Sequence, residues 1–164
     1  MGFTRRFVLL GALGSFLSAC ASKFRTYTGP EVTKIQVTKG DRRMHLFAGD
    51  TVLKSYKFEL GFAPEGHKEF EGDGRTPEGG YRISYKNPDS RFHLSLKINY
   101  PNANDRAKAR RMGKSPGGDI FIHGTPSMFA GESDWTWGCI AVTDREMEEI
   151  YSMVNVGTVI YIYP

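Results

Sequence analysis

The sequence contains only two cysteines, Cys20 and Cys139, which excludes a small protein built on a framework of disulfides. It has no unbroken apolar run of about 18 residues, which excludes a protein that crosses a membrane several times. It also lacks a strong charge of one sign. The net charge is +4 and falls to +2 without residues 1–20, so bulk charge predicts no nucleic-acid partner.

The remaining composition is that of a folded domain. Apolar residues make up 40% of the chain and aromatic residues 13%, which is enough for a core. A length of 164 residues fits one domain better than two. The 19 glycines and eight prolines predict many turns between short strands.

Residues 1–20 have the pattern of an export signal. Arg5 and Arg6 precede an apolar stretch of about ten residues, which is too short to span a bilayer comfortably. Leu17-Ser18-Ala19-Cys20 resembles the lipobox of bacterial lipoproteins, and this resemblance implies lipidation of Cys20. An ordinary signal peptide with an incidental cysteine is the alternative, and the arginine pair leaves both general and twin-arginine export open.

The lipobox resemblance also implies a location. The protein would be exported to the periplasm and anchored by lipid, by default in the outer membrane of a Gram-negative bacterium, since Ala21 rather than Asp follows the cysteine. The inner membrane stays open as an alternative. Residues 21–31 are expected to form a short tether to a domain over residues 32–164. The sequence carries no signal for an oligomeric state.

Alternating apolar and polar residues predict a domain of short strands. We expect them at residues 32–38, 44–46, 51–60, 81–85, 92–96, 119–123 and 158–163. One amphipathic helix is expected over residues 143–154, because Thr143 and Glu146 have capping-box spacing and Met147 and Ile150 begin an apolar stripe. The basic stretch 101–118 is expected to be a solvated lid or loop. The pattern therefore predicts a mainly β domain with one principal helix.

The chemistry-bearing residues gather in the last third of the chain. No histidines are spaced at i, i+3 or i+4, and Cys139 has no cysteine nearby, so no metal site is expected. The loop 124–138 could instead bring the Cys139 thiol to the imidazole of His123, which ends a strand. A histidine can accept the thiol proton and return one to a leaving amine. Successive N–H groups at Gly138 and Cys139 could hold an oxyanion. A core thiol beside Ile140 is the alternative.

Two motifs resemble the catalytic motif of the L,D-transpeptidase (YkuD) family, namely Ile122-His123-Gly124 and Thr136-Trp137-Gly138-Cys139-Ile140. Residues 74–83 and 157–162 resemble the strand entry and the closing strand of the family, so the resemblance covers about residues 33–163. Trp137 replaces the family's histidine before Gly-Cys, and Ala141 replaces a polar residue. This variant is similar to the YafK branch.

The resemblance implies a YkuD-type β-sandwich or barrel-like domain that acts on peptidoglycan stem peptides without a cofactor. The thiol would attack a stem tetrapeptide, release D-Ala and pass the acyl group to an amine during cell-wall cross-linking or remodelling. Two other functions stay open. One is an amidase or endopeptidase that hydrolyses such bonds or releases wall-linked protein, and the other is a wall-binding lipoprotein without catalysis.

The resemblance also assigns roles to individual residues. Cys139 would be the nucleophile and His123 the proton donor and acceptor, oriented by the Gly124 carbonyl, while Gly138 would supply an oxyanion N–H. The candidate substrate contacts are five residues. Thr136 would also brace the loop, and Trp135 and Trp137 would either wall a groove or pack in the core. His93 and Tyr100, in a strand and at its exit, would face either a groove or solvent.

Overall fold

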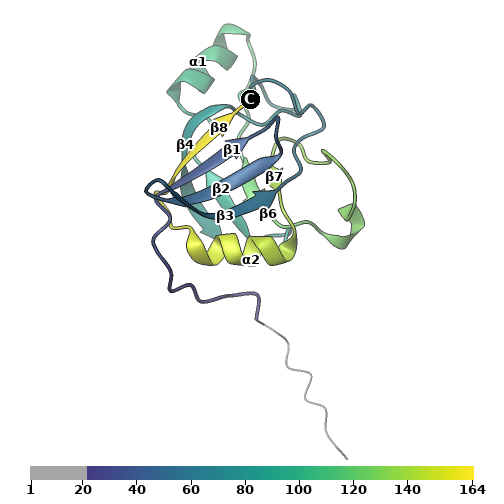
Figure 1. The fold of residues 1–164 in the computed structure, drawn as a ribbon. Helices are drawn as coiled ribbons and strands as arrows, with labels where there is room; N and C mark the ends of the chain where they lie inside the picture. Colours follow the sequence, from purple (N-terminus) through teal and green to yellow (C-terminus); the bar gives the residue numbers. More distant parts are fainter. Residues whose placement is uncertain (1–21) are drawn as a thin grey trace, which may run out of the picture.

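The computed structural model describes residues 22–164, and the signal pattern with Cys20 lies outside the described residues. Eight strands form one curled sheet in the order β3-β2-β1-β8-β4-β5-β6-β7 (Figure 1). The strands are β1 (Lys34–Thr38), β2 (Arg43–Ala48), β3 (Thr51–Lys57), β4 (Gly79–Asn87), β5 (Ser95–Ile98), β6 (Phe121–His123), β7 (Ile140–Ala141) and β8 (Val159–Tyr163). The expectation of a mainly β domain is confirmed.

Hydrogen bonds between the two ends of this sheet curl it toward a half-barrel. The segment that follows β3 returns to β7, where Glu59 and Ala141 exchange two backbone bonds of 2.8 and 2.9 Å. Next to them, the Thr136 N–H donates to the Leu60 carbonyl at 2.9 Å. The short β7, which the sequence pattern did not reveal, is therefore held on both sides.

The main helix is α2 (Asp144–Met153), which packs against β5 and β6 at the end of the sheet opposite α1 (Figure 1). Its predicted capping box is present, with the Thr143 hydroxyl accepting from the Glu146 N–H and the Glu146 carboxylate accepting from the Thr143 N–H. Met147 and Ile150 are fully buried against the sheet. The sequence interpretation of this helix is confirmed.

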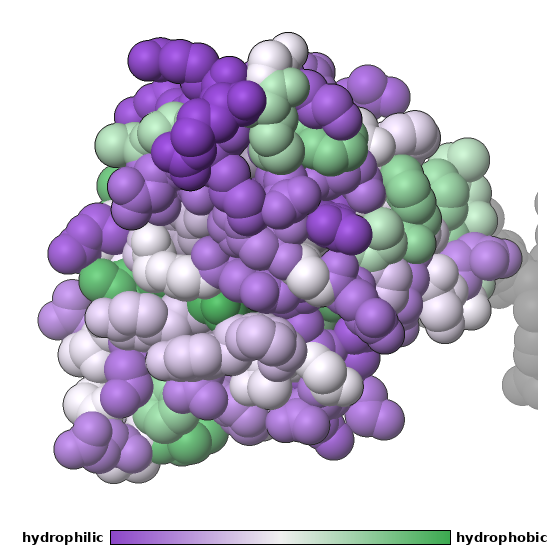
Figure 2. All heavy atoms as spheres, turned by 90° about the horizontal axis from the view of Figure 1, so that it is seen from above, coloured by the Kyte–Doolittle hydropathy of each residue, from purple (hydrophilic) through white to green (hydrophobic). Residues whose placement is uncertain are grey.

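A second helix, α1 (Ala103–Arg111), corrects the expectation of a loop over residues 101–118. The Asn102 side chain accepts from the backbone of Asn104 and Asp105, and the Asp105 carboxylate accepts from the Asn102 N–H. Only Asp105 and Ala109 of the helix are buried, so it carries no apolar stripe. Seen from the end of the molecule where α1 lies, the surface is mostly hydrophilic (Figure 2). A 3-10 helix, η1 (Ser127–Phe129), interrupts the loop after β6.

Residues 22–33, before β1, form neither helix nor strand, but they are attached to the domain. The guanidinium of Arg25 donates to the Glu148 carboxylate on α2 at 2.7 and 2.9 Å, and Lys23 donates to the Pro88 carbonyl at 2.6 Å. The part of the predicted tether within the described residues is thus docked along α2. Between residues 22 and 164, no helix is long and apolar enough to cross a membrane.

Candidate active site

His123 and Cys139 are positioned by two neighbouring parallel strands. In the register of β6 and β7, Ile122 lies opposite Ile140 and His123 opposite Ala141. Side chains alternate along strands, and both isoleucines are fully buried, so they face the core. Continuing the alternation one residue back places Cys139 on the same face as His123, two register positions away. The sheet therefore brings the predicted nucleophile and base to one face.

The imidazole of His123 is fixed by one hydrogen bond and two aromatic rings. Its Nδ1 lies 2.7 Å from the Gly124 carbonyl oxygen. Because a carbonyl only accepts, Nδ1 must carry the proton, and Nε2 is the basic nitrogen of the neutral ring. The ring stacks on Phe92, with centroids 4.5 Å apart, and contacts Trp135 at 5.6 Å. The orienting contact expected from Gly124 is thus present.

The Cys139 thiol is half-buried, and its surroundings favour the protonated form. Its Sγ lies 3.5 Å from the Asp119 carbonyl, to which the S–H donates. Burial raises the pKa of the thiol to about 11, and the Asp119 carboxylate acts in the same direction, while a hydrogen bond at the Phe121 backbone and the charge of Lys68 oppose the rise. A thiol with this pKa is almost fully protonated at neutral pH.

Burial also lowers the pKa of His123, against the opposing effects of its bond to the Gly124 carbonyl and of the Asp144 charge. Only 3% of His123 is exposed. A raised thiol pKa and a lowered imidazole pKa both favour the neutral pair. The resting site therefore has a neutral thiol and a neutral imidazole on one face of the sheet, and the proton has to move as the thiol attacks.

The loop before the nucleophile is braced by Thr136. Its hydroxyl donates to the Cys139 carbonyl at 2.8 Å and accepts from the Gly138 N–H at 3.1 Å. The Gly138 N–H, expected to hold an oxyanion, thus has the Thr136 hydroxyl as its acceptor in this structure. The Cys139 N–H has no acceptor among residues 22–164 and remains available. Thr136 is 3% exposed, which makes it a brace and not a substrate contact.

The position before the cysteine, Gly138, leaves no room for a side chain. Its φ is +115°, a conformation that residues with a Cβ rarely adopt, and a Cβ there would collide with the Arg75 carbonyl. The Gly138 carbonyl accepts from the Thr76 hydroxyl at 2.9 Å. The loop between β3 and β4 therefore supports the nucleophile from behind.

The two tryptophans have different environments. Trp135 is half-buried, stacks on Phe129 with centroids 4.2 Å apart and contacts the catalytic imidazole, so it packs the site from inside. Trp137 is 72% exposed and meets the edge of the exposed Phe62 at 5.0 Å. Only Trp137 is placed where a substrate can cover it.

The other two candidate contacts do not face a groove at the thiol. Tyr100 is 3% exposed, its hydroxyl donates to the Pro116 carbonyl at 2.9 Å, and its ring meets Tyr81. It is a core residue. The ring of His93 has its Nε2 3.0 Å from a Glu148 oxygen, on the side of α2. Both corrections follow from burial and hydrogen bonding that the strand pattern does not encode.

Sequence reasoning missed the buried ion pair of Lys68 and Asp73, which shapes the loop behind the thiol. Both side chains are nearly fully buried, and Nζ lies 2.8 Å from Oδ1. The Asp73 carboxylate also accepts from the backbone N–H groups of Glu69, Phe70 and Arg75. It missed Asp134 as well, which pairs with Arg42 at 2.7 Å. The latter pair spans 92 positions, and no local pattern reveals it.

Among the described residues, no three His, Cys, Asp or Glu side chains are arranged to hold a metal ion. What the site can do is acyl transfer through a thioester. It offers a thiol, a base with a defined tautomer, and a free N–H at the nucleophile itself.

Comparisons with known proteins agree with this chemistry. The L,D-transpeptidase catalytic domain (YkuD) matches residues 33–162. The chain is 31% identical over 136 residues to YafK of Escherichia coli K12, covering 79% of this chain and 50% of YafK. The helical cell shape determining protein Pgp2 of Campylobacter jejuni matches with a TM-score of 0.63 and 25% identity, over 83% of this chain and 49% of Pgp2. An L,D-transpeptidase of Mycobacterium smegmatis shares the fold, with a TM-score of 0.56 and 17% identity, over 83% of this chain and 60% of that one. The chain spans about half the length of YafK and Pgp2.

Proposed function

The chain belongs to the L,D-transpeptidase catalytic domain family, and we propose that it is an exported cysteine L,D-transpeptidase acting on peptidoglycan stem peptides. The observation that carries the proposal is the placement of Cys139 and His123 on one face of β6 and β7, with Nδ1 of the imidazole held by the Gly124 carbonyl. The similarity to Pgp2 supports a role in cell-wall remodelling that affects cell shape.

The first half of the reaction forms a thioester. The Cys139 sulfur attacks the carbonyl of the third stem residue while its proton passes to Nε2 of His123. The negative oxygen of the tetrahedral intermediate is met by the Cys139 N–H. The intermediate collapses as the imidazolium returns the proton to the leaving amine of D-Ala. The enzyme is then an acyl-thioester with a neutral imidazole.

The second half repeats these steps in reverse. An amine of a second stem peptide or of a protein attacks the thioester carbonyl and gives its proton to Nε2 of His123. The thiolate leaves and is protonated again. Exposed Trp137, two residues before Cys139, and exposed Phe62, whose ring meets it, are suited to contact the incoming groups. Water in place of the amine would make the same enzyme a hydrolase.

We include the anchor in the proposal, with lipid on Cys20 holding the enzyme in the periplasm at the outer membrane. The lipobox pattern supports it, and so does the docking of Arg25 on α2, which holds the chain next to the domain five residues after that cysteine. The test is the mass of the mature N-terminal peptide. A diacylglyceryl Cys20 that is absent from Cys20→Ser supports the anchor, and an unmodified chain starting at another residue contradicts it.

The test of the activity uses purified tetrapeptide muropeptides. The expected products are free D-Ala, an acyl adduct on the Cys139 peptide, and 3-3 cross-linked dimers. Cys139→Ala is the control and should form none of them while keeping its fold, since losing this small side chain costs only about 1 kcal/mol. If tripeptides form but dimers do not, the protein is a hydrolase and not a transferase. If neither an adduct nor a product forms, the remaining function is that of a wall-binding lipoprotein without catalysis.

A further inference from the structure

We propose that Asp144 is a positioning residue for this reaction, which holds its carboxylate against Gly124 and stabilises the positive charge that His123 carries after taking the thiol proton. The inference rests on the proposed function. It gives the Cys–His pair an anionic third member on α2. Asp144 touches neither the thiol nor the reacting carbonyl, so it acts only through His123 and its neighbour.

The first observation is the contact between Asp144 and Gly124. A Cβ on Gly124 would collide with Oδ1 of Asp144, so the carboxylate lies directly against the backbone that orients the catalytic ring. Oδ1 is buried and has no hydrogen-bond partner among the described residues, although the side chain as a whole is 46% exposed. One oxygen therefore faces the site and the other faces outward. A buried carboxylate oxygen without a partner is costly unless a positive charge compensates it.

The second observation is that α2 begins at the site. The Val142 N–H donates to the His123 carbonyl at 2.9 Å, and the Val142 carbonyl accepts from the Thr125 hydroxyl at 2.8 Å. Thr143 then caps the helix and Asp144 is its first residue. Val142, two residues before the helix, is thus bonded to His123 and to Thr125, which follows β6. These bonds tie the start of α2 to the backbone around His123.

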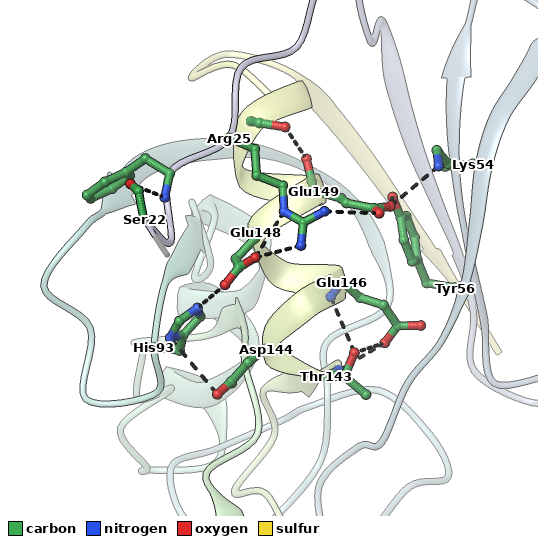
Figure 3. Close-up of polar contacts among 12 residues, drawn as sticks. Ser22, Arg25, Lys54, Tyr56, His93, Thr143, Asp144, Glu146, Glu148 and Glu149 are labelled. Carbon is green, nitrogen blue, oxygen red and sulfur yellow. Dashed lines mark hydrogen bonds and ion pairs between the residues drawn. The ribbon is translucent and has the colours of Figure 1, made fainter. Parts of the chain in front are cut away.

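A second histidine lies on the outer side of Asp144, as Figure 3 shows. The ring of His93 lies between two carboxylates of α2, with Nε2 3.0 Å from Glu148 and Nδ1 4.0 Å from Oδ2 of Asp144. Glu148 is in turn bonded to Arg25. The backbone at His93 has a φ of +70°, an uncommon conformation for a residue with a side chain. The structure therefore places the ring of His93 next to the outer oxygen of Asp144.

The charges around the pair favour this role. Asp144 acts to raise the pKa of His123 against the effect of burial. The rings packed on the imidazole, Phe92 and Trp135, are uncharged, and the raised pKa of the Cys139 thiol, just before β7, favours its protonated form. Asp144 borders a cavity of about 580 Å³. The other charged residues that line this cavity are one cation and three anions, namely Lys57, Glu59, Glu132 and Glu146. Among the described residues that line this cavity, Lys57 is thus one cation against four carboxylates, Asp144 included.

The test measures His123 itself and needs no turnover. We would follow its imidazole resonances by NMR against pH in the wild type, in Asp144→Asn and in Glu149→Gln. Asn keeps the size of Asp and removes one charge. The Glu149 variant removes the same charge from another face of α2, where Glu149 contacts Arg25, Lys54 and Tyr56. We expect His123 to titrate at lower pH in Asp144→Asn only.

The kinetic result should match. Asp144→Asn should lower kcat about two- to tenfold with KM unchanged, because the carboxylate favours a charged state that exists only during the reaction. If Asn impairs folding, Asp144→Ser, which suits a helix start, is used instead. An unchanged His123 titration in a folded Asp144 variant overturns the inference. In the other case, the pKa of His123 is lowered in Asp144→Asn but the wild type turns over no muropeptide. That result would keep the Asp144–His123 pairing and refute the proposed function.

Discussion

The Thr136 hydroxyl donates a 2.8 Å hydrogen bond to the carbonyl of Cys139, the nucleophile three residues later. The same oxygen accepts the Gly138 N–H. One buried hydroxyl thus closes the turn that presents the thiol, and it also occupies a donor that would otherwise point toward an oxyanion. The bond that closes the turn therefore also occupies the Gly138 N–H.

Replacing this hydroxyl should therefore affect both stability and rate. Thr136→Val keeps the shape, breaks both bonds and leaves a buried carbonyl and N–H unpaired, for an expected loss of about 1–3 kcal/mol in unfolding free energy. We also expect a lower kcat as the turn loosens. Thr136→Ser, which retains the hydroxyl, is the matched control. Denaturant unfolding and turnover measure the two effects, and equal stability of the Val and Ser variants would contradict the brace.

The pH dependence of thiol reactivity should reflect the raised pKa of Cys139. Burial keeps the thiol protonated at neutral pH, and only the thiolate reacts with iodoacetamide. The alkylation rate should therefore rise about tenfold per pH unit between pH 7 and 10, without a plateau. Adduct formation on the Cys139 peptide gives the rate. A plateau near pH 7 would instead reveal an ion pair already formed in the resting enzyme.

His123→Gln should separate chemistry from packing. Glutamine is of similar size and retains some hydrogen bonding, so the end of β6 should persist with near-native thermal stability. Turnover should fall by about two to four orders of magnitude, because neither proton transfer has a partner. Circular dichroism and muropeptide turnover test both statements. A variant that unfolds but keeps its turnover per folded molecule would make His123 a structural residue.

The Lys68–Asp73 pair predicts a large effect on stability. Asp73→Asn should destabilise the fold by about 3–5 kcal/mol, because it leaves the Lys68 ammonium buried without a counter-charge. Burial acts to raise the pKa of Asp73, but the hydrogen bonds from Lys68 and three backbone N–H groups prevail and lower it. The stability from Asp73 is therefore present above its unfolded pKa of about 3.9 and is lost as the pH falls through the lower folded value.

The control for this prediction is a surface pair. Asp50→Asn removes the same charge from a fully exposed side chain 3.8 Å from Lys34, and its Tm should not change measurably. Thermal unfolding of both variants between pH 3 and 7 tests the comparison. Equal Tm values for the two variants at pH 7 would show that the buried pair contributes nothing beyond a surface one.

The sequence was most informative where local patterns carry the structure. The capping box of Thr143 and Glu146 located α2, because its apolar stripe and its cap agree. Helix α1 has a cap of the same kind at Asn102 and Asp105, but it buries almost nothing, so periodicity alone could not reveal it. Strand β7 has two residues and depends on partners far along the chain, so it was not visible either.

The sequence predicted which residues carry the chemistry of the candidate site, but not the hydrogen bonds and contacts around them. His123 at a strand end and Cys139 after a glycine suggested the pair, and the structure places them on one face. The occupied N–H of Gly138 depends on how the Thr136 side chain turns, which spacing does not determine. The sequence pattern did not single out Asp144 as part of the site, because its contact with Gly124 spans 20 positions.

The bonds that close the curled sheet also make the candidate site depend on the completed fold. The residues flanking Cys139 bond to Glu59, Leu60 and Thr76, at separations of 62 positions or more. Closing such long loops costs entropy that only the completed domain offsets. A peptide containing residues 119–143 alone should therefore show no ordered thiol site. A half-folded molecule, in which these long-range bonds are not yet made, should therefore turn over no muropeptide.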